Sequence, residues 1–276
     1  MLLNFVDRSF DIKRLIHYRL SIQISLNGFS FSVFDEGLSK HVILRDYQYQ
    51  QNITNYEDLS AEIGSLSASD DCLALDYPVC TCLYISLKHT LIPENSFSKE
   101  KLRTYMEFVS PLEELDEIHY YKYPATDTYS IYVIPSLVAS KLTTYYKKIR
   151  FINQANPLIC GCLKNTEGSN ILYINLHNGV ADMVLAENKQ LKLHNAFEIY
   201  HLNDAVYYIT ALLHQFQLKL QTTPIYISGD VMKEEIEELT KYFPLLKINN
   251  NHRMSMLVGQ ENSYRYFNLL TAHECE

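Results

Sequence analysis

Apolar and polar residues alternate in three consecutive segments near the start of the chain. The segments are residues 18–26, 29–34 and 41–44, and Asn27 and Gly28 separate the first two. Alternation with a period of two is typical of a strand with one buried face, and Asn-Gly between two such runs indicates a hairpin. The pattern therefore predicts a three-stranded antiparallel meander.

The remainder of the first half predicts strands that alternate with helices. Thr54 and Glu57 have the spacing of a capping box, in which a hydroxyl and a carboxylate satisfy free N–H groups, so a helix should begin there. Pro135 fits the first turn of a helix that runs to about residue 149. Strands are expected at residues 79–87 and 130–134, and a helix is expected at residues 98–108.

The same plan begins again at residue 170. A second meander is predicted at residues 171–176, 180–185 and 190–197. Asn203 and Asp230 are then expected to cap two helices, with a strand at residues 224–228 between them. We interpret this as a weak internal duplication. The prediction is an α/β protein of two lobes, residues 1–150 and 151–276, each with a mixed sheet and flanking helices.

Charge and composition narrow the possible partners. The 276 residues include 24 Lys and Arg against 32 Asp and Glu, which gives a formal net charge of −8. An acidic chain is repelled by nucleic-acid phosphates, so no nucleic acid is expected. No run approaches the roughly 18 apolar residues of a membrane span, so no direct membrane insertion is expected. Asp7 and Arg8 interrupt the start too early for a secretory signal, which predicts a cytoplasmic protein.

Three short segments resemble the nucleotide motifs of the actin-like ATPase superfamily, which includes actin, Hsp70, the sugar kinases and FtsA. Residues 22–28 stand in the place of the first phosphate segment, residues 174–182 in that of the second, and residues 225–230 in that of the adenosine segment. Residues 130–176 look most similar to the pilus-assembly protein PilM. The whole chain resembles a bacterial family described as a domain of unknown function with an actin-like ATPase fold. The resemblance implies an actin-like ATPase, ribonuclease H-like fold.

The resemblance also implies which residues face a nucleotide or another ligand. These candidate cofactor-binding residues are Ser25, Asn27, Gly28, Asn175, His177, Asn178, Gly179, Asp182, Ser228, Gly229 and Asp230.

The departures from the superfamily pattern argue against catalysis. In active relatives, aspartates at two strand ends hold a hydrated Mg²⁺, whereas this chain has Ser25 and Asn175 there. A carboxylate about 4.5 Å from a divalent ion supplies on the order of 7 kcal/mol at an effective dielectric of about 20, and an uncharged group loses nearly all of it. His177 and Asn178 replace a glycine pair, and Asp230 replaces a glycine. Asp182 and Asp35 do not replace the missing carboxylates. We therefore expect no catalytic residues and no Mg²⁺-ATP chemistry.

The sequence contains two close cysteine pairs, but their spacing does not fit a zinc site. Cys80 and Cys82, and likewise Cys160 and Cys162, are separated by one residue, whereas structural zinc pairs usually have two to four between them. Cys80 and Cys82 are better interpreted as small core residues. We expect reduced thiols and no metal.

The aromatic composition is unusual, because the chain has 22 tyrosines and no tryptophan. Because tyrosine is favoured at interfaces, residues 119–123, His-Tyr-Tyr-Lys-Tyr, are our first candidate for a partner contact.

Our leading hypothesis is a non-catalytic actin-fold protein that serves as a binding or scaffold module, as PilM and FtsA recruit protein partners, with a residual ligand cleft between the lobes. The first alternative is a switch or weak ATPase that binds ATP or another nucleotide. The second is a kinase of a small metabolite, which needs a carboxylate as general base.

Overall fold

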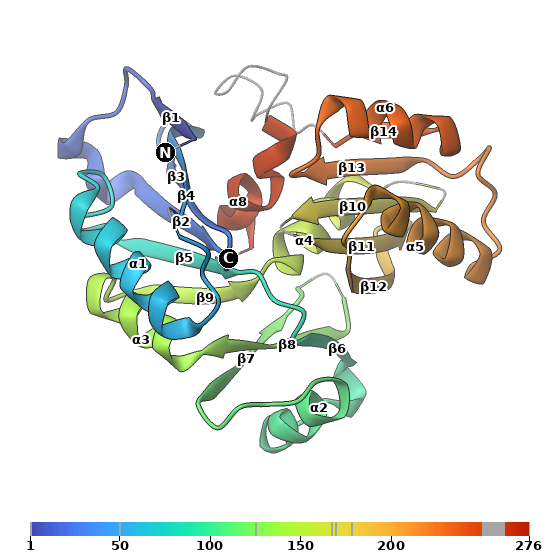
Figure 1. Ribbon diagram of the computed structural model, residues 1–276, viewed down its shortest axis with the longest axis horizontal. Coiled ribbons are helices and arrows are strands. Elements are labelled where there is room, and N and C mark those ends of the chain that lie inside the picture. The colour runs from blue at the N-terminus through green and yellow to red at the C-terminus, as the bar shows by residue number, and fades with distance from the viewer. Residues whose placement is uncertain are drawn as a thin grey trace. The chain divides into compact units, whose positions relative to one another are not determined.

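The computed structural model describes residues 2–49, 51–124, 126–166, 168, 170–177, 179–249 and 263–275. The chain divides into two compact units, Met1–Asn156 (unit 1) and Pro157–Cys275 (unit 2), which are shown in Figure 1. This division lies six residues after the expected boundary at residue 150. The assignment of residues 1–150 and 151–276 to two duplicated actin-like lobes stays a prediction.

Unit 1 contains a six-stranded sheet with the strand order β1-β4-β3-β2-β5-β9. Its strands are β1 (Leu3–Val6), β2 (Tyr18–Ile24), β3 (Gly28–Asp35), β4 (Lys40–Gln48), β5 (Val79–Tyr84) and β9 (Ile149–Asn153). The antiparallel pairs β2–β3 and β3–β4 confirm the predicted meander. β5 then pairs in parallel with β2, and β9 pairs in parallel with β5. The short edge strand β1 was not predicted.

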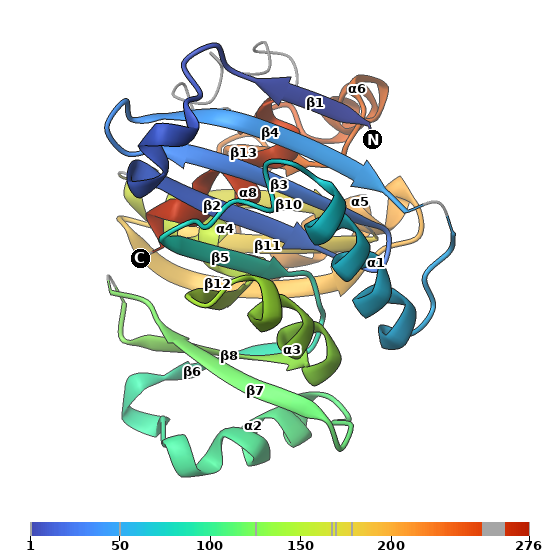
Figure 2. The ribbon, with the colours of Figure 1, turned by 90° about the vertical axis from the view of Figure 1, so that its left-hand side faces the viewer.

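The helices α1 (Tyr56–Ser69) and α3 (Ser136–Tyr145) lie side by side over one face of this sheet (Figure 2). Their buried residues, such as Leu59 and Leu142, join the main core of unit 1. The predicted cap of α1 is wrong by one position, because the side chain of Asn55 rather than Thr54 accepts the N–H of Asp58, at 2.8 Å.

The predicted end of α3 is also wrong. The backbone of Tyr146 is extended, with φ −120° and ψ 99°, so the helix ends at Tyr145. Ile149 instead begins β9, where it pairs with Cys80 of β5. The parallel strand pair therefore overrides the helical spacing of the apolar residues.

A second, three-stranded antiparallel sheet of unit 1 has the order β6-β8-β7. It consists of β6 (His89–Pro93), β7 (Asp116–Lys122) and β8 (Thr128–Pro135), and the helix α2 (Leu102–Val109) packs on it. Met106, Ile131 and Val133 form the small core between α2 and this sheet, whereas Tyr132 and Ile134 belong to the main core. The predicted strand at 130–134 is confirmed. The helix predicted at 98–108 is also present, but its α-helical part runs from Leu102 to Val109 after a 3-10 turn at Lys99–Lys101. The strands β6 and β7 were not predicted.

Unit 2 contains a five-stranded sheet with the order β12-β11-β10-β13-β14. Its strands are β10 (Ile171–His177), β11 (Val180–Glu187), β12 (Gln190–Glu198), β13 (Ile225–Gly229) and β14 (Leu246–Ile248). The antiparallel pairs β10–β11 and β11–β12 confirm the second meander. β13 joins β10 in parallel, as β5 joins β2 in unit 1.

The main helices after β9 are α4 (Ala155–Asn165), α5 (Leu202–Gln215), α6 (Lys233–Tyr242) and α8 (Phe267–Thr271). Two predicted caps are wrong. The N-cap residue of α5 is His201 rather than Asn203, and the Asp204 carboxylate accepts the N–H of His201 at 2.9 Å. At α6, Glu235 accepts the N–H of the N-cap residue Met232 at 2.8 Å, so Asp230 lies before the helix.

A change of backbone conformation marks the end of α5. The helix ends at Gln215, and Gln217 has a positive φ of 55°, so Leu220 lies outside it.

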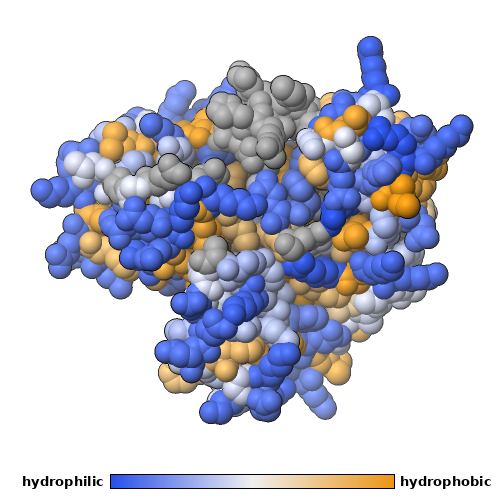
Figure 3. Space-filling view, turned by 180° about the vertical axis from the view of Figure 1, so that it is seen from behind, coloured by the Kyte–Doolittle hydropathy of each residue, from blue (hydrophilic) through white to orange (hydrophobic). Residues whose placement is uncertain are grey.

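The face of the protein in Figure 3 is mainly hydrophilic, with apolar residues in small patches. In the part of the chain that the structure describes, no helix combines the length and apolar character needed to cross a membrane.

The end of β13 requires a glycine. Gly229 has φ +96°, and a Cβ atom there would lie 2.0 Å from the carbonyl oxygen of Leu176. We expect Gly229→Ala to lower the free energy of unfolding by about 3 kcal/mol or more, because left-handed strain and a backbone clash add. Gly168→Ala is the matched control, since Gly168 has φ +85° with nothing within 4 Å of the added carbon. The control should lose only about 1–2 kcal/mol in urea unfolding. Equal losses in the two variants would contradict the clash.

Candidate functional site

The hydroxyl of Ser25 closes the first predicted phosphate turn. It accepts the N–H of Asn27 at 3.1 Å and that of Gly28 at 3.2 Å, while the Ser25 N–H donates to the Gly28 carbonyl at 3.1 Å. Ser25 is buried. The position that holds an aspartate in active relatives therefore serves here to stabilise the β2–β3 hairpin.

A buried chain of neutral polar groups lies at the second predicted strand end. The Asn175 side-chain N–H donates to the Ser228 hydroxyl oxygen at 2.9 Å, and the Asn268 side-chain N–H donates to Asn175 Oδ1 at 3.1 Å. Ser228 donates in turn to the carbonyl of Ile174 at 3.2 Å. The parallel pair β10–β13 places Asn175 beside Ser228, so the structure brings two predicted residues together.

Sequence reasoning missed Asn268, which α8 contributes from 93 positions further along the chain. No local pattern marks it. Its Oδ1 is buried and has no hydrogen-bond partner in the described residues.

Two residues that were not predicted, Tyr264 and Arg265, contact the end of the predicted adenosine segment, residues 225–230, and the residue after it. The Asp230 carboxylate forms an ion pair with the Arg265 guanidinium. The Tyr264 hydroxyl donates to the carbonyl of Val231 at 3.0 Å. The Asp230 N–H donates to the carbonyl of Leu176 at 2.5 Å, across the tight approach at Gly229. The negative charge of Asp230 is therefore matched by a cation from the C-terminal segment.

His177 is the last residue of β10 and is half-buried. Burial lowers its pKa to about 4, although the carboxylates of Asp230 and Asp182 act in the opposite direction. The imidazole is therefore neutral at pH 7. Gly179 follows with φ +78°, and its carbonyl accepts the N–H of Ile199 at 2.7 Å. Asn178 lies outside the described residues.

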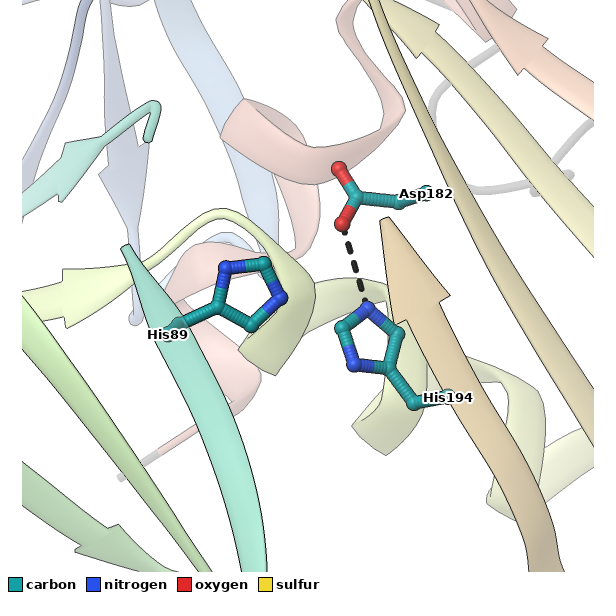
Figure 4. A group of neighbouring side chains, drawn as sticks. All are labelled: His89, Asp182 and His194. Atoms are coloured by element: carbon teal, nitrogen blue, oxygen red, sulfur yellow. Dashed lines mark hydrogen bonds and ion pairs between the residues drawn. The ribbon is translucent and has the colours of Figure 1, made fainter. Parts of the chain in front are cut away.

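Asp182 is the buried carboxylate of the second hairpin. Its Oδ1 lies 3.1 Å from Nε2 of His194 on the neighbouring strand β12, as the dashed line in Figure 4 shows. Both side chains are at most 2% exposed. His89, also drawn there, belongs to unit 1, where its Nδ1 lies 3.0 Å from the carbonyl oxygen of Ser86.

Asp35, which follows the first hairpin, also forms an ion pair. Its buried carboxylate forms an ion pair with Arg14 at 3.1 Å. Each of the three aspartates near the predicted turns, Asp35, Asp182 and Asp230, therefore has a partner within its own unit.

The two cysteine pairs occupy different elements, β5 and α4. Cys80 and Cys82 are buried in β5, and burial raises the pKa of both thiols. Their interpretation as small core residues is confirmed. The expectation of no metal stays a prediction.

The candidate partner segment 119–123 lies on β7 and the residue after it. Tyr120 is exposed, whereas Tyr121 packs against the main core of unit 1. Tyr123 is buried and donates to Asn156 Oδ1 at 2.9 Å. Of these three tyrosines, Tyr120 is exposed, Tyr121 is half-buried and Tyr123 is buried.

Several solved structures have a fold similar to that of this chain. A Bacteroides thetaiotaomicron protein of unknown function with an actin-like ATPase fold matches with a TM-score of 0.80 and 23% identity, covering 89% of this chain and 97% of that one. PilM, from a PilM–PilN type IV pilus biogenesis complex, matches with a TM-score of 0.64 and 10% identity over 94% and 98% of the two chains. The ethanolamine utilization protein EutJ of Carboxydothermus hydrogenoformans matches with a TM-score of 0.50 and 8% identity, over 92% and 89%.

The chain therefore has an actin-like ATPase fold, as the resemblance implied. Residues 7–246 match the family described as "Protein of unknown function (DUF3822)", and the chain belongs to this family. A search of curated protein sequences found no match.

The low pKa of His177 predicts an acid-dependent loss of stability. The pKa is about 4 in the folded state and about 6.5 when the chain unfolds, so protonation favours the unfolded chain. The stabilisation is complete above pH 6.5 and is lost as the pH falls towards 4, with a total of up to about 3 kcal/mol. His177→Gln removes this titration. The difference in unfolding free energy between wild type and variant should therefore shrink from pH 7 to pH 4, and parallel curves would refute the burial argument.

Proposed function

We propose that this protein is a non-catalytic member of the actin-like fold that acts as a binding or scaffold module. The observation that carries the proposal is the buried neutral chain formed by Asn175, Ser228 and Asn268. A Mg²⁺-ATP site needs a carboxylate at this strand end. The carboxylate either binds the ion directly or accepts hydrogen bonds from the water molecules bound to the ion. Here both ends of the Asn175 amide are engaged by uncharged groups.

The loss of a carboxylate beside Mg²⁺ costs enough binding energy to argue against ordinary Mg²⁺-ATP catalysis. One carboxylate near a divalent ion contributes on the order of 7 kcal/mol, which corresponds to about five powers of ten in binding. Two such positions, Ser25 and Asn175, carry no charge. Ser25 is in addition committed to its own turn. These facts support a protein that has kept the fold and lost the ATPase chemistry.

A protein is the kind of partner that we propose. The similarity to PilM, which was solved in a complex with PilN, supports this choice. The acidic charge of −8 makes a nucleic acid or an anionic lipid surface a poor alternative. The predicted ligand cleft and the predicted cytoplasmic location remain parts of this proposal.

One observation favours the alternative of a nucleotide-binding switch. Asn268 Oδ1 is buried without a partner among the residues described, and a hydrogen-bond donor from a ligand would satisfy it. A metabolite kinase receives less support. It needs a carboxylate as general base, and Asp35, Asp182 and Asp230 are all paired.

Thermal-shift titration separates these functions. The melting temperature should not change with ATP or ADP at about 1 mM, with or without Mg²⁺, because Ser25 and Asn175 supply no charge to hold the ion. A site with a dissociation constant of about 10 μM would add about 2.7 kcal/mol at that concentration, or roughly 5 °C or more for a chain of this size. Mg²⁺ alone and nucleotide with a chelator are the controls. A Mg²⁺-dependent rise would overturn the scaffold proposal in favour of the switch.

A further inference from the structure

A preformed pocket of about 320 Å³ lies within unit 1, at the beginnings of α1 and α3. It is lined by the residues before and within the first turn of α1, by the segment that leads into β7, and by the start of α3. The lining residues include Tyr56, Glu57, Glu113, Leu115, Asp116 and Ser136.

Hydrogen bonds hold the walls of the pocket together. The Ser136 N–H donates to the carbonyl of Leu115 at 3.1 Å, which fixes the β7 segment to α3. Asp116 Oδ2 accepts the Glu113 N–H and the Lys88 ammonium, both at 2.9 Å. The Asn55 cap fixes the start of α1 on the other side. The pocket therefore does not need to form on binding, which lowers the entropic cost of binding a partner.

The pocket carries an excess of negative charge. Glu57, Glu113 and Asp116 are three carboxylates. Among the described residues, Lys88 is the one cation paired with them: it binds Asp116 and lies 3.8 Å from Glu113. The positive ends of the two helices offset about half a charge each. Glu57 is exposed and has no ion pair in the described part of the chain. The three carboxylates, the ammonium and the two helix ends together leave a net charge of about −1, which repels an anion and attracts a cation.

The other lining residues offer apolar surface on which the methylene groups of a lysine or arginine side chain can pack. Leu115 is 66% exposed although it is apolar, and Pro135, Leu137 and the half-buried ring of Tyr56 also contribute to the lining. Lysine and arginine pack their methylene stems on apolar surface while the charged head stays at polar groups. A guanidinium can also stack on a tyrosine ring.

We propose that this pocket receives an arginine or lysine side chain from a segment of a partner protein, with the charged head between Glu57 and Glu113 and the stem along Leu115. The proposal deepens the function proposed above and rests on it. The partner segment should therefore contain a basic residue with apolar residues on either side of it. These apolar residues would pack on the exposed Leu115.

Pools of labelled hexapeptides test this proposal with the full-length chain. Each pool has mixed residues at five positions and a fixed central arginine, citrulline or glutamate, and binding is followed by fluorescence anisotropy. Citrulline keeps the shape of arginine and removes its charge. We expect the arginine pool to bind at least about fivefold more tightly than the citrulline pool, with an advantage that falls as salt rises.

Two double variants locate the site. Glu57→Gln with Glu113→Gln should weaken arginine-pool binding about fivefold or more, since both partners of the cation lose their charge. Glu234→Gln with Glu237→Gln is the matched control, because it makes the same change in net charge on α6. This control should leave binding unchanged. Melting temperatures of the variants show whether either change affects folding.

Three results would overturn the pocket proposal: no binding of the arginine pool at millimolar protein, equal binding of the arginine and citrulline pools, or tighter binding of the glutamate pool. An equal effect of the two double variants would overturn it as well. These failures are distinguishable from failure of the scaffold function, which would appear as a nucleotide- and Mg²⁺-dependent rise in melting temperature without any peptide.

Discussion

The chemistry of this protein depends on one repeated constraint, the parallel pairing of the first meander strand with a strand far along the chain. In unit 1, β2 pairs with β5, and in unit 2, β10 pairs with β13. A parallel pair needs a long crossover and places both carboxyl ends at the same edge of the sheet. For this reason Asn175 and Ser228 meet, although 53 positions separate them.

The groups that meet at this edge determine what the fold can do. An amide, a hydroxyl and a second amide satisfy one another there, while the nearby carboxylates of Asp182 and Asp230 are matched by His194 and Arg265. Asn175, Ser228 and Asn268 themselves contribute no carboxylate at this edge. We therefore attribute the proposed binding function to other surfaces of the fold, and we propose the acidic pocket of unit 1 as such a surface.

The candidate site was only partly predictable. The positions of Ser25 and Asn175 at strand ends followed from alternation and the resemblance, because both are local features. Asn268 and Arg265 were missed, since they come from the C-terminal segment and no spacing links them to the strand ends. The pocket was missed for the same reason. Glu57 and Glu113 lie on separate segments of the chain, and the contact that fixes Asp116 comes from Lys88 on a third segment.

The sequence by itself determined both meanders, the helices that follow them and the uncharged residues at the two strand ends. These features follow from periodicity over a few residues and from residue identity. The tertiary structure decided where α3 ends, which residues cap α1, α5 and α6, how β6, β7 and β8 form a separate sheet, and which groups meet Asn175. The physical reason is that strand pairing and side-chain hydrogen bonds depend on distances in space, which local patterns do not encode.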